Sequence, residues 1–299
     1  MSTTHDHYIA NLYNTRSTAY STTSNDSWHP SFAHTLLTTA LKSSLPLPSQ
    51  NPILLDLACG TGLVSLGALS HHLLPQTAHI IGVDLSPGML SVARARLAQL
   101  PVTEQSRVQL LEHSMLSLRT HPILSPLKGK VDIITCASAF VLLPDAQTRT
   151  AALNEWAAML KPGTGRLVFD VTHEHNLRAG LVMEAVGKRL GLRTPGERGW
   201  ITREDAVREL VEGCEGLEEQ SIEVVAQTGE GTVRLSAGRE VAITKFERMI
   251  GTGAYSEFKG AREGEAREAF VEEWEQAKGE DGLVEVVDGV YVIVARRKA

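Results

Sequence analysis

The chain has few cysteines, and none of them has the spacing that disulfide or metal frameworks use. Its three cysteines, Cys59, Cys136 and Cys214, lie far apart and form no Cys-x-x-Cys pair. Disulfide-stapled domains are dense in cysteine, and structural zinc sites use closely spaced pairs. We therefore expect free thiols in a reducing compartment and no bound metal.

Long apolar runs and an excess of basic charge are also absent. No apolar segment approaches the roughly 18 to 20 residues that cross a bilayer. The first residues, Met1-Ser-Thr-Thr-His-Asp-His, have neither the basic nor the apolar part of a secretory signal. With a net charge of -6, the chain offers no basic surface for a phosphate backbone. These absences favour a cytoplasmic protein without a membrane or nucleic-acid partner, and leave small molecules and proteins as substrates. We expect a small-molecule acceptor and a monomer or homodimer.

What the sequence does contain is a regular alternation of strand and helix patterns between residues 51 and 171. A buried-strand pattern at Ile53-Leu-Leu-Asp-Leu runs into a glycine turn, and Ser86-Pro87 places an N-cap and a first-turn proline after a second strand. Such alternation predicts a doubly wound α/β fold. The other strands expected here begin at Val108, Val131 and Arg166, and a helix covers roughly 146–160.

Beyond this core the sequence predicts further elements rich in Glu, Lys and Arg. We expect helices near 174–190, 203–213, 239–250 and 262–278, and strands near 221–227 and 283–295 that can pair as a hairpin. The Asp288-Gly289 turn signal leaves the last strand open as one bulged strand or two short ones. The domain organisation that follows is an N-terminal lid over 1–50 and a main domain over 51–299, with cap elements around 172–205 and 230–280.

A glycine turn carries the clearest chemical signal. In Asp56-Leu-Ala-Cys-Gly-Thr-Gly62 a strand passes directly into a turn where Gly60 and Gly62 let a ligand approach the backbone. Ligands of open α/β sheets bind at this edge, the carboxyl ends of the strands. Asp84 closes the next strand, where a carboxylate can accept both hydroxyls of a ribose. The two features together indicate an adenosine-type ligand.

Two adenosine-type ligands compete for this turn: a dinucleotide such as NAD and a sulfonium nucleoside. A carboxylate at Asp56 would repel a pyrophosphate but would attract the ammonium group of a methionine moiety. Ser65 also stands at the third position of Gly-x-Gly-x-x-Gly, where glycine or alanine is usual. Both observations favour the sulfonium nucleoside.

The order of four motifs resembles the class I S-adenosylmethionine-dependent methyltransferases. They are Asp56-Leu-Ala-Cys-Gly-Thr-Gly, Gly82-Val-Asp-Leu-Ser-Pro-Gly-Met, Val131-Asp-Ile-Ile-Thr-Cys and Leu160-Lys-Pro-Gly-Thr-Gly-Arg-Leu. The resemblance covers about residues 8 to 171. It implies a Rossmann-like doubly wound seven-stranded sheet of order 3-2-1-4-5-7-6, with S-adenosylmethionine as the cofactor.

The same resemblance assigns cofactor contacts. They fall on the glycine turn, the next two strand ends and the lid, at Asp56, Ala58, Gly60, Gly62, Asp84, Leu85, Met89, Ser114, Met115, Tyr13, Arg16 and Tyr20. Ordinary packing is the alternative for Leu85, Met89 and the lid residues. One departure stands out, because Ser114 falls where the family usually has an acid that receives the adenine amino group. A hydroxyl accepts this bond more weakly, and the backbone at Met115 can contribute.

On the acceptor side, methyl transfer requires chiefly that the nucleophile be positioned and water excluded. His173 and His175 follow the fifth strand and are candidate general bases for an oxygen nucleophile, or else a hydrated loop that caps the next helix. A His-x-His metal site lacks a third ligand nearby. Phe140 shields the sulfonium, contacts the acceptor or belongs to the core, and Trp200 either lies over the acceptor pocket or packs in the core.

The lid, the Asp-x-Ala-Cys-Gly motif and a tryptophan-containing cap are similar to small-molecule methyltransferases of fungal secondary metabolism, including gliotoxin bis-thiomethyltransferase. This similarity implies methylation of a thiol or hydroxyl on a small organic metabolite. A thiolate acceptor needs no strong base because it is already a good nucleophile. Two alternatives remain: carbon methylation of a quinone-type ring, and a methyltransferase-like protein that binds the cofactor without catalysis and serves as a partner.

Overall fold

The computed structural model describes residues 4–17, 28–41, 50–176, 178–201, 203–226 and 231–299. The chain forms two compact units, each described by itself. The first comprises Met1–Val171, Val207–Glu223 and Val292–Ala299, and the second comprises Thr172–Ala206 and Val224–Tyr291. Each unit therefore draws on segments that are far apart in the sequence.

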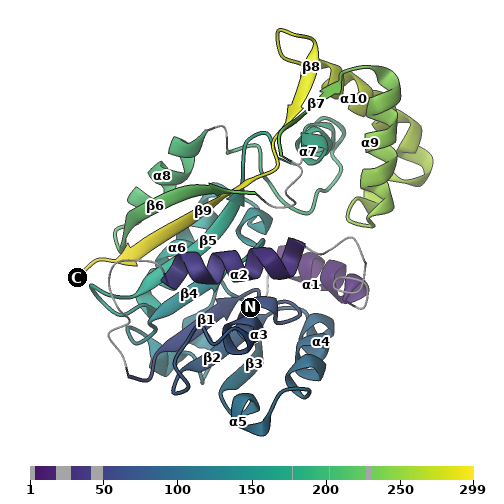
Figure 1. Cartoon of the computed structure of the whole chain (residues 1–299). Coiled ribbons are helices and arrows are strands. Elements are labelled where there is room, and N and C mark those ends of the chain that lie inside the picture. The colour runs from purple at the N-terminus through teal and green to yellow at the C-terminus, as the bar shows by residue number, and fades with distance from the viewer. Residues whose placement is uncertain (1–3, 18–27, 42–49, 177, 202, 227–230) are drawn as a thin grey trace. The chain divides into compact units, whose positions relative to one another are not determined.

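A seven-stranded sheet organises the main fold, with the order β3-β2-β1-β4-β5-β9-β6 (Figure 1). Neighbouring strands from β3 to β5 pair in parallel. Because β7 and β8 form a separate antiparallel pair, β9 is the seventh strand of this sheet along the chain, and the expected order 3-2-1-4-5-7-6 is confirmed. The strands are β1 Ile53–Leu57, β2 His79–Asp84, β3 Val108–Glu112, β4 Ile133–Cys136, β5 Arg166–Thr172, β6 Leu217–Val225 and β9 Val290–Arg297.

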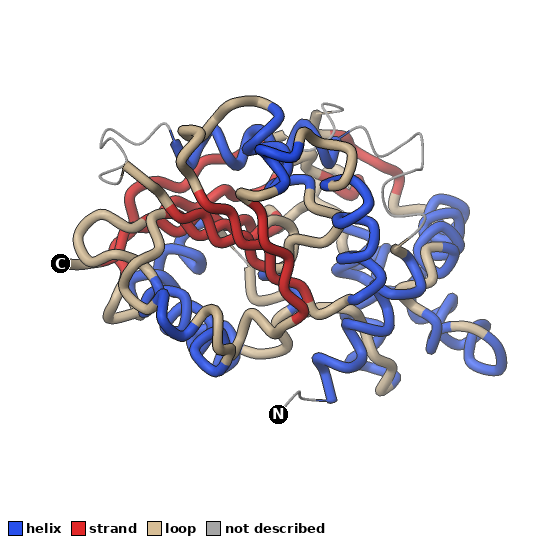
Figure 2. The backbone as a smooth tube through the Cα atoms, turned by 90° about the horizontal axis from the view of Figure 1, so that it is seen from below, coloured by secondary structure: helices blue, strands red, loops and turns tan. Residues whose placement is uncertain are grey.

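The central strands read as continuous apolar runs because helices cover a parallel sheet on both faces. Leu55, Ile80 and Ile134 have no exposed surface, and Figure 2 shows the red strands running side by side as one twisted layer. The helices of the first unit include α1 Thr4–Arg16, α2 Trp28–Leu41, α3 Leu63–Ser70, α4 Pro87–Leu97, α5 Val102–Gln105 and α6 Ala146–Met159.

Helix starts follow the capping chemistry of the sequence. The Ser86 hydroxyl oxygen accepts the Met89 N–H at 3.1 Å, and the Asp145 carboxylate accepts the Thr148 N–H at 2.7 Å. Each side chain thereby satisfies one of the backbone donors that a helix leaves unpaired at its first turn. The predicted N-cap and proline at Ser86-Pro87 are confirmed.

Three packed helices and a two-stranded ribbon form most of the second unit. The helices are α7 Arg178–Leu190, α9 Arg239–Gly251 and α10 Glu263–Gln276, and the ribbon pairs β7 Val233–Ser236 with β8 Leu283–Val286. Phe246, Phe270 and Trp274 have no exposed surface and fill the space between the helices. α8, Glu204–Glu212, contributes to both units along the sequence.

The C-terminal expectations hold in part. The four expected helices are present as α7 to α10, and β6 lies beside β9 as a pair. The stretch around Asp288-Gly289 is two strands, β8 and β9, which belong to different sheets. The sequence did not predict β7, because four residues with mostly exposed side chains give no periodic signal.

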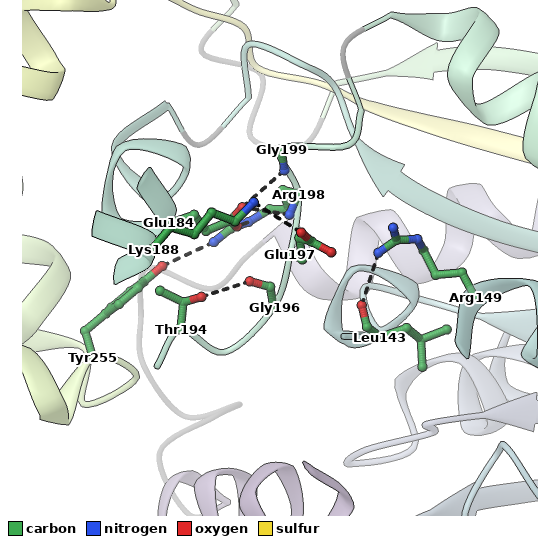
Figure 3. Close-up of polar contacts among 10 residues, drawn as sticks. All are labelled: Leu143, Arg149, Glu184, Lys188, Thr194, Gly196, Glu197, Arg198, Gly199 and Tyr255. Carbon is green, nitrogen blue, oxygen red and sulfur yellow. Dashed lines mark hydrogen bonds and ion pairs between the residues drawn. The ribbon is translucent and has the colours of Figure 1, made fainter. Parts of the chain in front are cut away.

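A buried ion pair fixes the turn before Trp200 (Figure 3). The Arg198 Nε donates to Glu184 Oε1 at 2.7 Å, and the side chains are 10% and 4% exposed. The backbone N–H groups of Arg198 and Gly199 donate to the other Glu184 oxygen, and Arg198 also donates to the Tyr255 hydroxyl. Such a pair is tolerated inside a protein because its remaining polar atoms are bonded.

Candidate functional site

The glycine turn between β1 and α3 has an unusual backbone. Ala58, Gly60 and Gly62 have φ values of 51°, 55° and 82°. These lie in the left-handed region, which glycine adopts without strain. A Cβ on Gly62 would also lie 3.2 Å from the Leu66 side chain. The turn therefore requires the glycines that the sequence analysis singled out.

Asp84 holds the far side of this turn. Its Oδ2 accepts the Gly60 N–H at 2.7 Å, and its Oδ1 accepts the Ser86 N–H at 2.8 Å. Burial raises the pKa of the Asp84 carboxyl, against the lowering effect of these backbone donors. A carboxylate has about four acceptor positions, so Asp84 retains capacity for the two hydroxyls of a ribose.

A cavity of about 740 Å³, part of it open to solvent, lies at this edge of the sheet. It joins the glycine turn and Asp84 to the residues after β3 and β4 and to α1. The predicted cofactor residues that line it are Tyr13, Ala58, Gly60, Asp84, Leu85, Met89, Ser114 and Met115.

Asp56 is placed differently, 1% exposed beneath the turn. Its Oδ2 accepts the Ser65 N–H at 3.1 Å and the Ser65 hydroxyl at 2.6 Å, and its Oδ1 accepts the Thr135 hydroxyl at 2.9 Å. Burial raises its pKa to about 6. The observed contacts tie β1, α3 and β4 together, and Asp56 faces a smaller hollow beside the turn. Its attraction for a ligand ammonium stays a prediction.

Two other predicted cofactor residues, Gly62 and Arg16, do not line the main cavity. Gly62 is the N-cap of α3. The Arg16 guanidinium carbon lies 5.8 Å from the centre of the Tyr13 ring, a distance typical of a cation–π contact. Tyr20 lies outside the described residues.

Helix α1 is attached to the core by side chains that the sequence analysis missed. His5 Nε2 lies 2.7 Å from the Leu142 carbonyl oxygen. Asn14 Oδ1 accepts the Ser86 hydroxyl at 2.6 Å and the Gly88 N–H at 2.9 Å. His5, Ile9 and Tyr13 line the cavity together. Their four-residue spacing places them on one helix face, which is the signal that could have found them.

The candidate acceptor residues are held by neighbours of their own. Phe140 has no exposed surface and its ring centre lies 4.8 Å from that of Phe169 and 5.7 Å from that of Trp156, as in the core alternative. Trp200, in the second unit, is half-buried beside the turn that Arg198 and Glu184 fix. Their contact with an acceptor stays a prediction.

His173 and His175 belong to the second unit, with their rings 5.8 Å apart. The His175 N–H donates to His173 Nδ1 at 3.2 Å, and Arg178 Nη1 donates to His175 Nδ1 at 3.3 Å. The Arg178 donor favours the neutral His175 tautomer with the proton on Nε2. His173 Nδ1, by contrast, also lies 3.4 Å from Glu174 Oε2, which is an acceptor. Burial lowers the pKa of His173, and its ring stacks on Tyr291. His175 lines a cavity of the second unit, and the role of either residue as a base is still a prediction.

The described residues contain neither a membrane-spanning helix nor a metal-binding cluster. Across the residues that the structure describes, no helix combines the length and apolar character of a membrane span. Among those same residues, no group of three or more His, Cys, Asp or Glu side chains is arranged to hold a metal ion.

Comparison with known proteins identifies the central part of the chain. Residues 54–163 match the methyltransferase domain family. The chain is 32% identical over 156 residues to an uncharacterized methyltransferase of Emericella nidulans, covering 50% of this chain and 52% of that protein. It is 35% identical over 131 residues to a ubiquinone/menaquinone biosynthesis C-methyltransferase of Syntrophotalea carbinolica, covering 43% and 48%. The chain thus spans about half the length of these curated relatives.

A solved structure shares the fold. Magnesium protoporphyrin IX methyltransferase from Synechocystis PCC 6803, with bound SAH, has a TM-score of 0.53 and 15% sequence identity. The alignment covers 74% of this chain and 93% of that one. At this level of identity the likeness concerns the fold alone.

Proposed function

We propose that this protein transfers the methyl group of S-adenosylmethionine to a small organic molecule. Residues 54–163 match the methyltransferase domain family, and the motifs resemble the class I S-adenosylmethionine-dependent members. The observation that carries the proposal is the cavity at the glycine turn, where Asp84 presents a carboxylate beside Gly60. A ribose diol needs such an acceptor, and the left-handed backbone of the turn lets the ligand approach closely.

We further propose that the acceptor atom is a thiol sulfur or a hydroxyl oxygen of a small metabolite in a pathway of secondary metabolism. Arg178 donates to His175 Nδ1 and thereby favours a protonated Nε2 on that ring, an arrangement that suits an acceptor needing little help from a base. A thiolate is such an acceptor. Carbon methylation of a quinone-type ring is the second candidate, which the 35% identity to a quinone-pathway C-methyltransferase favours.

Cofactor binding is tested with Asp84→Asn in calorimetric titrations of S-adenosylmethionine, S-adenosylhomocysteine and NADH. The amide keeps the shape of the side chain but presents one acceptor oxygen instead of two. We therefore expect the Kd values of S-adenosylmethionine and S-adenosylhomocysteine to rise by about 10- to 100-fold. The control is Glu112→Gln, because Glu112 is the exposed partner of Asp84 on β3 and does not line the cavity. Binding of NADH alone would contradict the proposal.

The acceptor is sought with radiolabelled S-adenosylmethionine and sets of small thiols, phenols and quinols. Labelled product from thiols or phenols supports the first candidate, and label on a quinol ring carbon supports the second. Tight cofactor binding without turnover on any set would favour the non-catalytic partner. Activity that survives in His173→Ala and His175→Ala would show that neither imidazole serves as the base.

A further inference from the structure

Asp6 on α1 is an acid buried at the cavity wall. Its side chain belongs to a residue that is 6% exposed, in the first turn of a helix whose opposite end is held by Asn14. The Ser114 hydroxyl donates to Asp6 Oδ2 at 3.4 Å, and both residues line the cavity. Asp6 and Asp84 are the two acids among the described residues that line it.

The two acids lie beside different parts of the cavity wall. Asp84 lies beside the glycine turn, whereas Asp6 lies beside the residues that follow β3, Ser114 and Met115. Apolar side chains complete the wall, from Ile9, Leu85, Met89, Leu142 and Leu143. Adenosine has a matching distribution of hydrogen-bond donors, because its ribose hydroxyls and its exocyclic amino group lie on opposite sides of a flat aromatic ring.

Ser114 alone is poorly equipped to receive that amino group. Its hydroxyl proton is directed to Asp6, and its oxygen accepts the Leu116 N–H at 3.3 Å. A hydroxyl has two lone pairs, so this contact occupies half of its accepting capacity. A carboxylate has about four acceptor positions and forms charge-assisted bonds roughly twice as strong as neutral ones.

We propose that Asp6 receives the exocyclic amino group of adenine and selects adenine over 6-oxopurines. This inference rests on the proposed function. The acid comes from α1 instead of the turn after β3, where the resemblance places it and where this chain has Ser114. A 6-oxopurine presents a carbonyl oxygen at that position, which the Asp6 carboxylate repels.

The test compares S-adenosylhomocysteine with S-inosylhomocysteine, in which a carbonyl replaces the amino group. The unaltered protein is expected to bind the adenosine compound at least about tenfold more tightly. In Asp6→Asn the side-chain amide can donate to the carbonyl, so the ratio of the two Kd values falls by at least about tenfold. The control is His7→Asn, at the exposed neighbouring position of the same helix.

A double variant separates a direct contact from an effect on the helix. Asp6→Asn combined with Ser114→Asp returns the carboxylate to the turn after β3, and we expect it to restore the preference for the adenosine compound. An unchanged Kd ratio in Asp6→Asn, or a double variant that discriminates no better than Asp6→Asn, would overturn the assignment of Asp6. If the unaltered protein binds neither compound, it is the proposed function that fails.

Discussion

At the scale of single residues, substitution by alanine should change stability in opposite directions at Gly62, the N-cap of α3, and at Gly67 within that helix. Gly62→Ala places a Cβ at φ 82° and 3.2 Å from Leu66, so we expect the free energy of unfolding to fall by about 1 to 2 kcal/mol. Gly67→Ala in the middle of α3 puts its Cβ at an ordinary 3.9 Å from Leu37. That change should raise stability by roughly 0.5 to 1 kcal/mol. Urea unfolding measures both, and equal effects would show that the turn does not depend on Gly62.

At the scale of elements, α1 depends on a few polar anchors. Asn14→Ala removes the acceptor of the Ser86 hydroxyl and the Gly88 N–H, at a cost of about 1 to 2 kcal/mol. We expect amide hydrogen exchange in α1 to become about tenfold faster, while β1 and β4 keep their protection. S-adenosylmethionine should slow this exchange if the helix covers the bound cofactor. Asn11→Ala, exposed on the same helix, is the control, and equal exchange in both variants would refute the anchoring role.

At the scale of the whole molecule, a buried carboxyl should make stability depend on pH. Asp170 accepts the Ser138 N–H at 2.6 Å, and burial raises its pKa from 3.8 to about 7. The folded protein therefore holds a proton that the unfolded chain releases above about pH 4, so this group's contribution to stability falls as the pH rises toward 7. Compared with Asp170→Asn, the unaltered protein should lose about 2 kcal/mol between pH 5 and pH 8.

Urea unfolding at the two pH values measures this difference. The control is Asp145, an acid whose pKa is lowered in the folded protein instead of raised. The Thr148 N–H lowers the pKa of Asp145, which is therefore ionised in both the folded and the unfolded chain throughout this range. Asp145→Asn should change stability by the same amount at pH 5 and pH 8. If Asp170→Asn does likewise, Asp170 does not hold a proton in the folded state.

The sequence by itself determined the sheet and the cofactor edge, because both arise from local patterns. Apolar runs such as Ile53–Leu57 define buried strands, Ser86-Pro87 starts a helix, and Gly60 with Gly62 marks a turn that few other residues can form. In a parallel sheet these turns share one edge. The resemblance to the methyltransferase family placed Ser114 at that edge together with Asp84, and both residues line one cavity.

Only the tertiary structure decided what α1 brings to that cavity and how the buried acids are used. Asp6 and Ser114 are 108 positions apart, and no periodicity links them. The carboxylate oxygens of Asp56 accept hydrogen bonds from the Ser65 and Thr135 hydroxyls, and this arrangement follows only from the packing of β1, α3 and β4. The predicted contact of Asp56 with a ligand stays a prediction. Burial likewise raises the pKa of Asp170. Turns and strands depend on neighbouring residues, so the sequence predicts them directly. Contacts between distant segments depend on how the elements pack, so only the tertiary structure determines them.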